Sequence, residues 1–146
     1  MRCPVRWLRA DETVDTVLDV DLDSLMVQGK RAILFDLDNT LEPGRPTVLR
    51  QTTRAFLDGV LARGFRIGVL SNRRGLTLES QQALRVEGVA MLFHAGKPRK
   101  TGYFRLLRGL DVPVDEAVFV GDRRLTDVLG ACRVGLTSIR VRRPMP

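Results

Sequence analysis

The sequence lacks the features that mark membrane-spanning, secreted and disulfide-rich proteins. None of the apolar runs in its 146 residues is long enough to cross a bilayer. The first residues have no apolar stretch of the kind that forms a signal peptide. Two cysteines, Cys3 and Cys132, are too few for a disulfide framework, and neither has a neighbouring His or Cys that would suggest a zinc site. These absences lead us to expect a cytoplasmic protein.

Aromatic residues are also scarce, at 5%, so the core must consist mainly of Leu, Val and Ala. A hydrophobic content of 44% with 28% charged residues favours one folded domain over disorder. The formal net charge of +7 favours anionic partners: a phosphorylated substrate, an acidic membrane surface or nucleic acid. The alternative is that the surplus reflects only a proteome that prefers Arg. The single histidine, His94, is assigned a structural role, which is the commoner one for a lone His.

Apolar runs and helical periodicities alternate along the chain, and this alternation predicts parallel strands joined by right-handed crossovers. The expected strands are 32–35, 66–70, 89–93, 117–120 and 136–141. The expected helices are 48–63, 76–87, 101–110 and 126–133. We therefore predict an α/β fold: a single Rossmann-like, three-layer domain over residues 1–146 with a five-stranded, mainly parallel sheet.

The N-terminal segment is harder to assign. Residues 1–12 are expected to form a tail, in which Trp7 and Leu8 lie among arginines and either pack on the domain or touch lipid headgroups. A short strand or turn is expected around residues 17–20.

The stretch Ala32 to Thr40 organises the chain, because a short apolar run ends there in two carboxylates and a hydroxyl. Ala32 to Phe35 is typical of a strand buried on both faces. In an open α/β sheet, ligands bind at the carboxyl ends of the strands. One carboxylate, Asp36, can serve as a nucleophile and the other, Asp38, as an acid/base, or both can hold a hard divalent cation such as Mg²⁺. The plainer alternative is that these residues only form the turn that closes the strand.

Polar side chains follow the other predicted strands as well. Ser71 and Asn72 come after the second strand, Lys97 after the third, and Asp122 and Asp127 after the fourth. Each alone fits a turn, a helix cap or a solvated loop charge. Together, at tips that share one edge of a parallel sheet, they supply what phosphoryl transfer needs: carboxylates for a metal, a hydroxyl donor and a cation for phosphate.

The ordered set Asp36-Leu37-Asp38-Asn39-Thr40, Ser71-Asn72, Lys97-Pro98 and Gly121-Asp122 to Asp127 resembles the four motifs of the haloacid-dehalogenase (HAD) superfamily. More narrowly, the chain resembles the YqeG-type phosphatases of HAD subfamily IIIA, which include phosphatidylglycerophosphate phosphatases. The segments between the motifs hold one helix each, so no large cap domain is expected.

The resemblance implies a role for each matching residue. Asp36 would be the nucleophile, and Asp38 the general acid/base. Mg²⁺ would be bound by Asp36, the backbone carbonyl of Asp38 and Asp122, while Asp127 would orient the metal's shell or pair with Lys97. The phosphate-binding residues would be Thr40, Ser71, Asn72 and Lys97, with Asn72 the weakest candidate.

The implied function is a Mg²⁺-dependent phosphomonoester hydrolase with an aspartyl-phosphate intermediate and phosphatidylglycerophosphate as the favoured substrate. Its partners would be the phosphorylated substrate and an anionic lipid headgroup, met by peripheral contact with the inner face of the membrane. Three alternatives stay open: a phosphatase for nucleotides or nucleic-acid ends, a phospho-accepting receiver domain and an RNA-binding protein. The phosphatase for nucleic-acid ends suits the charge, but no aromatic-interleaved basic platform is present. A receiver needs no acid/base at position 38, and an RNA-binding protein with a decayed site is disfavoured because all the motif residues are present.

Three basic pairs follow the predicted strand tips: Arg73-Arg74, Arg99-Lys100 and Arg123-Arg124. One interpretation is a basic collar around an open site that attracts anionic lipid and phosphorylated substrates. The other is that loops are simply polar.

Overall fold

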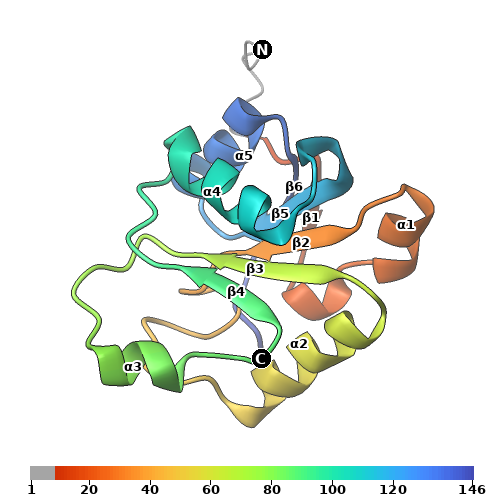
Figure 1. Ribbon diagram of the computed structural model, residues 1–146. Helices are drawn as coiled ribbons and strands as arrows, with labels where there is room; N and C mark the ends of the chain where they lie inside the picture. The colour runs from red at the N-terminus through yellow and green to blue at the C-terminus, as the bar shows by residue number, and fades with distance from the viewer. Residues whose placement is uncertain (1–8) are drawn as a thin grey trace.

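The computed structural model describes residues 9–146, and it contains one α/β domain built on a six-stranded sheet (Figure 1). The predicted contact of Trp7 and Leu8 falls outside the described residues. The strands are β1 (Glu12–Val14), β2 (Ala32–Phe35), β3 (Arg66–Leu70), β4 (Val89–Leu92), β5 (Ala117–Gly121) and β6 (Thr137–Val141). Their order is β1-β6-β5-β2-β3-β4, and every neighbouring pair is parallel. The predicted α/β class and parallel sheet are confirmed.

The prediction of five strands was wrong, because β1 adds a sixth strand beside β6. Glu12, which we had assigned to the tail, is the first residue of β1, and the preceding Asp11 accepts a hydrogen bond from the Ser138 backbone N–H at 2.8 Å. The expected strand or turn at 17–20 is the 3₁₀ turn η1 (Val17–Asp19). A capping box fixes this turn. The Thr16 N–H donates to Asp19 Oδ2 at 3.0 Å, and Thr16 Oγ1 accepts from the Leu18 N–H at 3.2 Å.

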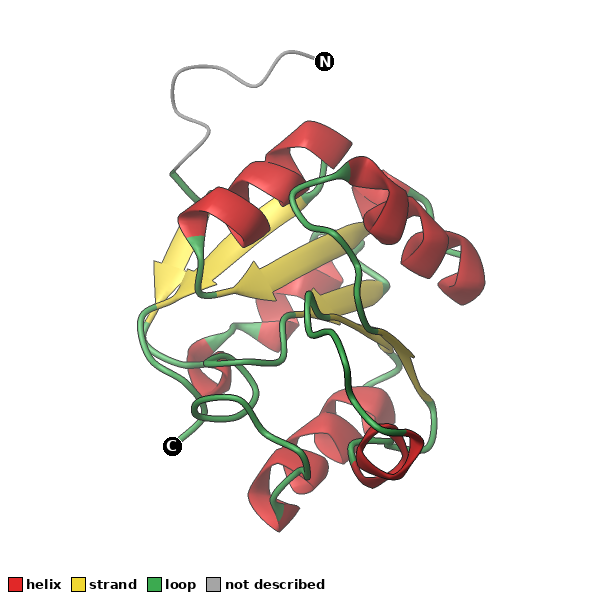
Figure 2. Cartoon of the chain, turned by 90° about the vertical axis from the view of Figure 1, so that its left-hand side faces the viewer, coloured by secondary structure: helices red, strands yellow, loops and turns green. Residues whose placement is uncertain are grey.

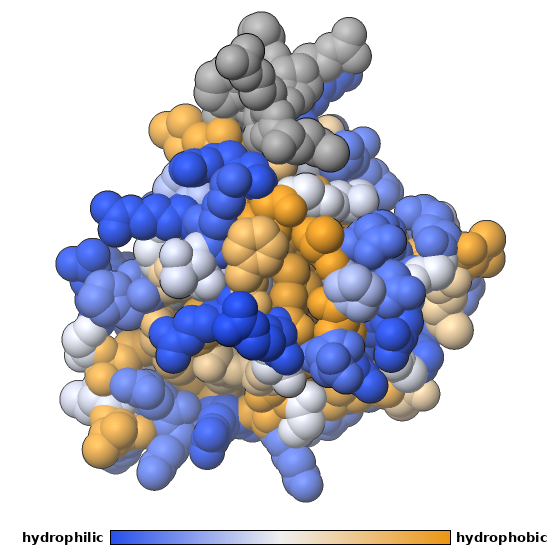
Figure 3. Space-filling model, turned by 45° about the horizontal axis from the view of Figure 1, so that its top comes forward, coloured by the Kyte–Doolittle hydropathy of each residue, from blue (hydrophilic) through white to orange (hydrophobic). Residues whose placement is uncertain are grey.

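Helices cover both faces of the sheet, which gives the three layers seen in Figure 2. They are α1 (Leu22–Val27), α2 (Gln51–Ala62), α3 (Leu78–Ala83), α4 (Lys100–Leu110) and α5 (Leu129–Val134), with the 3₁₀ turn η2 (Val114–Glu116) and the π-helical turn η3 (Arg124–Val128). No helix in the described range 9–146 is long and apolar enough to cross a membrane. Figure 3, with the α4 and α5 side brought forward, shows a mainly hydrophilic surface crossed by an apolar strip.

Strand β2 lies at the centre of the fold and is buried on both sides. Ile33 and Phe35 belong to the apolar cluster that includes Leu57 of α2, whereas Ala32 and Leu34 belong to the cluster under α4 and α5. All four β2 side chains are fully buried, as the apolar run predicts. Burial of each large aliphatic side chain stabilises the fold by about 1.5–3 kcal/mol.

The topology also fixes where a ligand can bind. The chain runs outward from β2 through β3 to β4 and then crosses back to β5 and β6, so the order reverses between β2 and β5. Ligands in open α/β sheets bind at the carboxyl ends of the strands where the order reverses. Asp36 follows β2 and Asp122 follows β5, directly at this point.

Candidate active site

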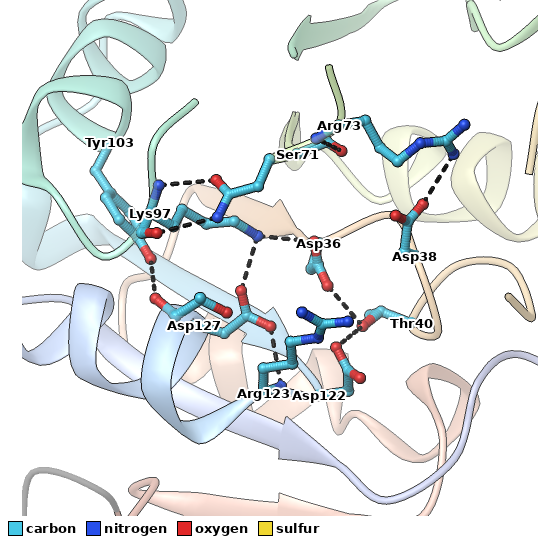
Figure 4. Close-up of polar contacts among 12 residues, drawn as sticks. Asp36, Asp38, Thr40, Ser71, Arg73, Lys97, Tyr103, Asp122, Arg123 and Asp127 are labelled. Carbon is cyan, nitrogen blue, oxygen red and sulfur yellow. Dashed lines mark hydrogen bonds and ion pairs between the residues drawn. The ribbon is translucent and has the colours of Figure 1, made fainter. Parts of the chain in front are cut away.

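A cavity of about 190 Å³ opens at the carboxyl edge of the sheet. It is lined by Asp36, Asp38, Asn39, Arg45, Ser71, Asn72, Arg73, Lys97, Arg123 and Thr126. Five of the eight residues predicted for the site therefore line the cavity. The other three lie just behind this lining: Thr40, in the loop after β2, contacts Asp36, and Asp127, in η3, contacts Lys97 (Figure 4). Asp122, which follows β5, is linked to Asp36 through Thr40.

Lys97 is the electrostatic centre of this site. Its Nζ lies 2.7 Å from Asp36 Oδ1 and 2.7 Å from Asp127 Oδ1, and its side chain is only 2% exposed. Burial alone would lower the pKa of Lys97, but the charges of Asp127 and Asp36 outweigh it and raise that pKa. Lys97 is therefore a permanently charged cation between two buried carboxylates.

Asp36, Asp122 and Asp127 form an acidic cluster in which one oxygen from each lies within 4.8 Å of the others. Burial raises the pKa of Asp36 and of Asp127 to about 6, in spite of the lowering effect of Lys97. Burial also raises the pKa of Asp122. Three carboxylates beside one ammonium leave an excess of negative charge, and carboxylate oxygens are the ligands that hard divalent cations prefer. The cluster therefore fits a site for such a cation.

The members of the acidic cluster differ in how many of their oxygens are already engaged. Asp127 accepts from Lys97 through Oδ1 and from the Arg123 backbone N–H through Oδ2 at 3.0 Å. Thr40 Oγ1 lies 3.5 Å from Asp36 Oδ2 and 3.4 Å from Asp122 Oδ1, so it links the other two carboxylates. Asp122 thus keeps the most freedom to bind a cation directly.

Asp38 lies apart from the acidic cluster, although it is only two residues from Asp36. Its carboxylate points toward Arg73, whose Nη1 lies 3.2 Å from Asp38 Oδ1 (Figure 4). The side chain is 22% exposed, in contrast to 9% for Asp36. The two carboxylates of the Asp-x-Asp pair therefore have different surroundings, as separate chemical roles require.

Ser71 and Asn72 hold the loops of the site in place. The Asn72 side chain forms two hydrogen bonds with the backbone of Lys97. Its Oδ1 accepts from the Lys97 N–H at 2.8 Å, and its Nδ2 donates to the Lys97 carbonyl at 3.0 Å. Ser71 is buried, and its Oγ accepts from the Arg73 backbone N–H at 3.1 Å. In this structure Asn72 fixes the Lys97 loop, and Ser71 lines the cavity.

Arg73 and Tyr103 are parts of the site that sequence reasoning did not identify. Arg73 was assigned to the exposed collar, but its side chain is only 9% exposed and is bound to Asp38. Tyr103 donates from its hydroxyl to the Thr126 carbonyl at 3.0 Å, and so holds η3 beneath Asp127. The neighbours Arg74 and Arg124 are exposed and do not line the cavity. The basic pairs are therefore not equivalent, and the collar is not uniform.

Comparison with known proteins agrees with this geometry. A family model described as HAD-hydrolase-like matches residues 94–143. The chain is 30% identical over 139 residues to the probable phosphatase YqeG of Bacillus subtilis, which covers 93% of this chain and 78% of YqeG. It is 32% identical over 129 residues to the chloroplastic phosphatidylglycerophosphate phosphatase 1 of Chlamydomonas reinhardtii. That match covers 84% of this chain but only 48% of the algal protein.

Solved structures show the same fold. An uncharacterized protein from Listeria monocytogenes superposes with a TM-score of 0.60 at 22% identity, over 80% of this chain and 82% of its own. A haloacid dehalogenase-like hydrolase from Brucella suis superposes with a TM-score of 0.59 at 16% identity, over 86% and 93%. The sheet order, the four motifs at one edge and the extent of the YqeG match lead to one conclusion: this chain belongs to the HAD-like hydrolase family, with the YqeG-type phosphatases among its relatives.

Proposed function

We propose that this chain is a Mg²⁺-dependent phosphomonoester hydrolase that works through a phosphoaspartate at Asp36. The observation that carries the proposal is the contrast between the two carboxylates of one short turn. Asp36 is buried and held by Lys97, whereas Asp38 is partly exposed and held away from the acidic cluster. A nucleophile needs the first environment, and an acid/base that exchanges protons needs the second.

In the first step, a carboxylate oxygen of Asp36 attacks the phosphorus, and the bond from phosphorus to the alcohol oxygen breaks. Asp38 gives its proton to that departing oxygen. In the second step, Asp38 takes a proton from water, which attacks the phosphorus, and phosphate leaves as the Asp36 carboxylate is restored. Lys97 neutralises one of the negative charges that approach each other, because it lies 2.7 Å from Asp36.

The residues that would hold the metal are Asp36, Asp122 and the backbone carbonyl of Asp38, with Asp127 keeping Lys97 and the neighbouring turn in place. A bound Mg²⁺ would neutralise phosphate charge and position the phosphoryl group for attack. Ser71, whose side chain lines the cavity, would donate to a phosphate oxygen.

For the substrate we propose phosphatidylglycerophosphate, which carries an anionic phosphodiester beside its terminal phosphomonoester. The chain's similarity to the algal phosphatase supports this choice. So do Arg45 and Arg123, two exposed arginines that line the outer part of the cavity and suit a second anionic group. Only one loop and one helix separate β2 from β3, so the cavity stays open to a large headgroup.

The test is release of phosphate from a panel of lipid, nucleotide and simple alkyl phosphomonoesters, with Mg²⁺ and with excess chelator. We expect hydrolysis only with Mg²⁺, and fastest on phosphatidylglycerophosphate. Activity that persists in chelator would contradict the metal requirement, and preference for a nucleotide would contradict the lipid substrate. Asp36→Asn should abolish turnover on every substrate.

Arg123→Gln and Arg124→Gln form a matched pair for the substrate proposal. Both remove one exposed charge from the same turn, but only Arg123 lines the cavity. We expect Arg123→Gln to raise KM for phosphatidylglycerophosphate severalfold and Arg124→Gln to leave it unchanged. Equal effects would show that only the general surface charge matters.

Contact with an anionic membrane surface is the last part of the proposal. Arg99 and Lys100 are exposed at the start of α4, on the same edge of the sheet as the cavity. A basic residue near such a surface contributes about 1 kcal/mol to binding. Sedimentation with vesicles rich in phosphatidylglycerol should show weaker binding after Arg99→Gln and Lys100→Gln together. Unchanged binding would exclude a role for this pair.

A further inference from the structure

Arg73 carries an inference that goes beyond the proposed function and rests on it. We propose that Arg73 is a positioning residue that holds the Asp38 carboxylate toward the leaving group of the substrate. Its Nη1 lies 3.2 Å from Asp38 Oδ1, and both side chains line the same cavity. No other described residue forms a hydrogen bond or ion pair with the Asp38 side chain.

The backbone of Arg73 is fixed on both sides, so the guanidinium projects from a rigid base. The Arg73 N–H donates to Ser71 Oγ at 3.1 Å, directly beyond β3. Its carbonyl accepts from the His94 N–H at 2.9 Å, at the end of β4. Two neighbouring strands of the sheet therefore determine where the side chain starts.

The guanidinium then bridges to a different part of the chain, the loop after β2. Besides Asp38, its Nη1 donates to the Pro46 carbonyl at 2.8 Å. The same loop is closed internally by the Gly44 N–H, which donates to Asn39 Oδ1 at 2.8 Å. The backbone around Asp38 is thus held, and Arg73 restricts the remaining freedom of the Asp38 side chain.

The pairing with Arg73 also makes the two carboxylate oxygens of Asp38 different from each other. Oδ1 accepts from Arg73, whereas Oδ2 has no hydrogen-bond partner among residues 9–146. With one oxygen held, the other is left to carry the proton and to face a departing alcohol. General acid catalysis depends on such placement, because the acid must be within hydrogen-bond reach of the leaving oxygen.

Arg73 makes these contacts at a cost to stability. Its Nε is the one buried side-chain polar atom in the described chain that lacks a hydrogen-bond partner. An unsatisfied buried donor destabilises the folded state, and an ion pair with a partly exposed carboxylate recovers little of that loss. The bond to the Pro46 carbonyl explains why the side chain crosses to the loop after β2, and the pairing with Asp38 adds a role in placing that carboxylate.

The experiment compares two leaving groups. The p-nitrophenolate released from p-nitrophenyl phosphate is a stable anion and departs without a proton. The alcohol oxygen of an alkyl phosphate must receive a proton from the general acid as it departs. The quantity to measure is kcat/KM. It reports only the steps up to and including the first irreversible one, and so excludes the later hydrolysis of the phosphoaspartate. The alkyl substrate is the soluble alkyl phosphomonoester that the wild-type protein hydrolyses fastest.

Arg73→Gln should lower kcat/KM for the alkyl substrate about tenfold or more, a share of the 10²–10⁴-fold that general acid catalysis contributes. For the aryl phosphate the change should stay within about threefold, because the acid is not needed there. The matched control is Arg74→Gln, which removes an exposed charge at the next position and should change neither value. In an Asp38→Asn background, Arg73→Gln should add almost nothing, since nothing is left to position.

Equal loss on both substrates would overturn the inference and place Arg73 on the transferred phosphoryl group or in a structural role. No loss on either would also overturn it. If Arg73→Gln does not fold, Arg73→Lys, which keeps the charge but lacks the planar guanidinium that binds Asp38 and Pro46 together, takes its place with the same expected selectivity. Failure of the proposed function would appear differently, as an inactive wild-type protein or an active Asp36→Asn variant.

Discussion

Replacement of Lys97 by Met should be the most damaging single change to the stability of the metal-free protein at neutral pH. Lys97 is 2% exposed and lies 2.7 Å from both Asp36 Oδ1 and Asp127 Oδ1. Removing one partner from a buried ion pair typically costs about 3–5 kcal/mol. Since the total stability of a domain is about 5–15 kcal/mol, the variant should be only marginally folded.

The cost should depend on pH in a defined direction. Burial raises the pKa of Asp36 and Asp127 to about 6, from 3.8, so these groups favour the folded state most when protonated. Their contribution is therefore complete below about pH 3.8 and is lost as the pH rises through about 6. Lys97 lowers both pKa values, so its removal raises them further and increases the loss at pH 7.5. The Lys97→Met variant should consequently be much closer to wild type at pH 5 than at pH 7.5.

The assay is urea unfolding in excess chelator at the two pH values, with Lys100→Met as the control. Lys100 is exposed, so its replacement should change the free energy of unfolding by less than about 0.5 kcal/mol. Adding Asp127→Asn to Lys97→Met should restore part of the lost stability, because it removes one of the uncompensated charges. A cost below about 1 kcal/mol at pH 7.5, or an equal cost at both pH values, would refute this reasoning.

Two further predictions concern the metal and the packing around the site. Asp122→Ala should raise the Mg²⁺ concentration needed for half-maximal activity more than Asp127→Ala does, because both Asp127 oxygens already accept hydrogen bonds within the protein; a Mg²⁺ titration giving the reverse order would contradict the assignment. Gly130→Ala should destabilise the fold by about 1–3 kcal/mol, since the new Cβ would lie 2.1 Å from Tyr103 Oη. Gly109→Ala, where the space is open, is the control and should be neutral or stabilising in thermal unfolding.

The parts of the fold that the sequence predicted are those governed by local apolar pattern. The strands from β2 to β6 each coincide with an apolar run, and their parallel arrangement brought the predicted motifs to one edge. Strand β1 was missed because Glu12–Val14 has two exposed side chains and gains its place by pairing with β6. Nothing in its local pattern distinguishes it from a polar loop.

Helix boundaries near the site were the least predictable, because tertiary contacts fix them. The helix expected from Val48 begins instead at Gln51, since the Arg50 N–H and guanidinium are held by the Glu42 carboxylate. The helix expected at 126–133 is divided into η3 and α5. The N–H groups of both Asp127 and Val128 donate to the Arg123 carbonyl, and this widened turn directs Asp127 at Lys97.

The placement of Arg73 could not be predicted either. Its position two residues after Ser71 indicates a loop near the site, and most loop arginines are exposed. Whether it turns outward or across to Asp38, 35 residues away along the chain, depends on how the loop after β2 packs against the end of β3. A sequence pattern carries no information on that packing.

The most direct test of the central claim is to trap the phosphorylated protein. Asp38→Asn should form the phosphoaspartate from an activated aryl phosphate but hydrolyse it slowly, because the group that activates water is lost. After an acid quench, mass spectrometry should find one added phosphoryl group, labile to hydroxylamine, on the peptide that contains Asp36. The same peptide should be unmodified in Asp36→Asn. A phosphoryl group on another residue, or turnover of the aryl phosphate without any covalent adduct in Asp38→Asn, would contradict the account.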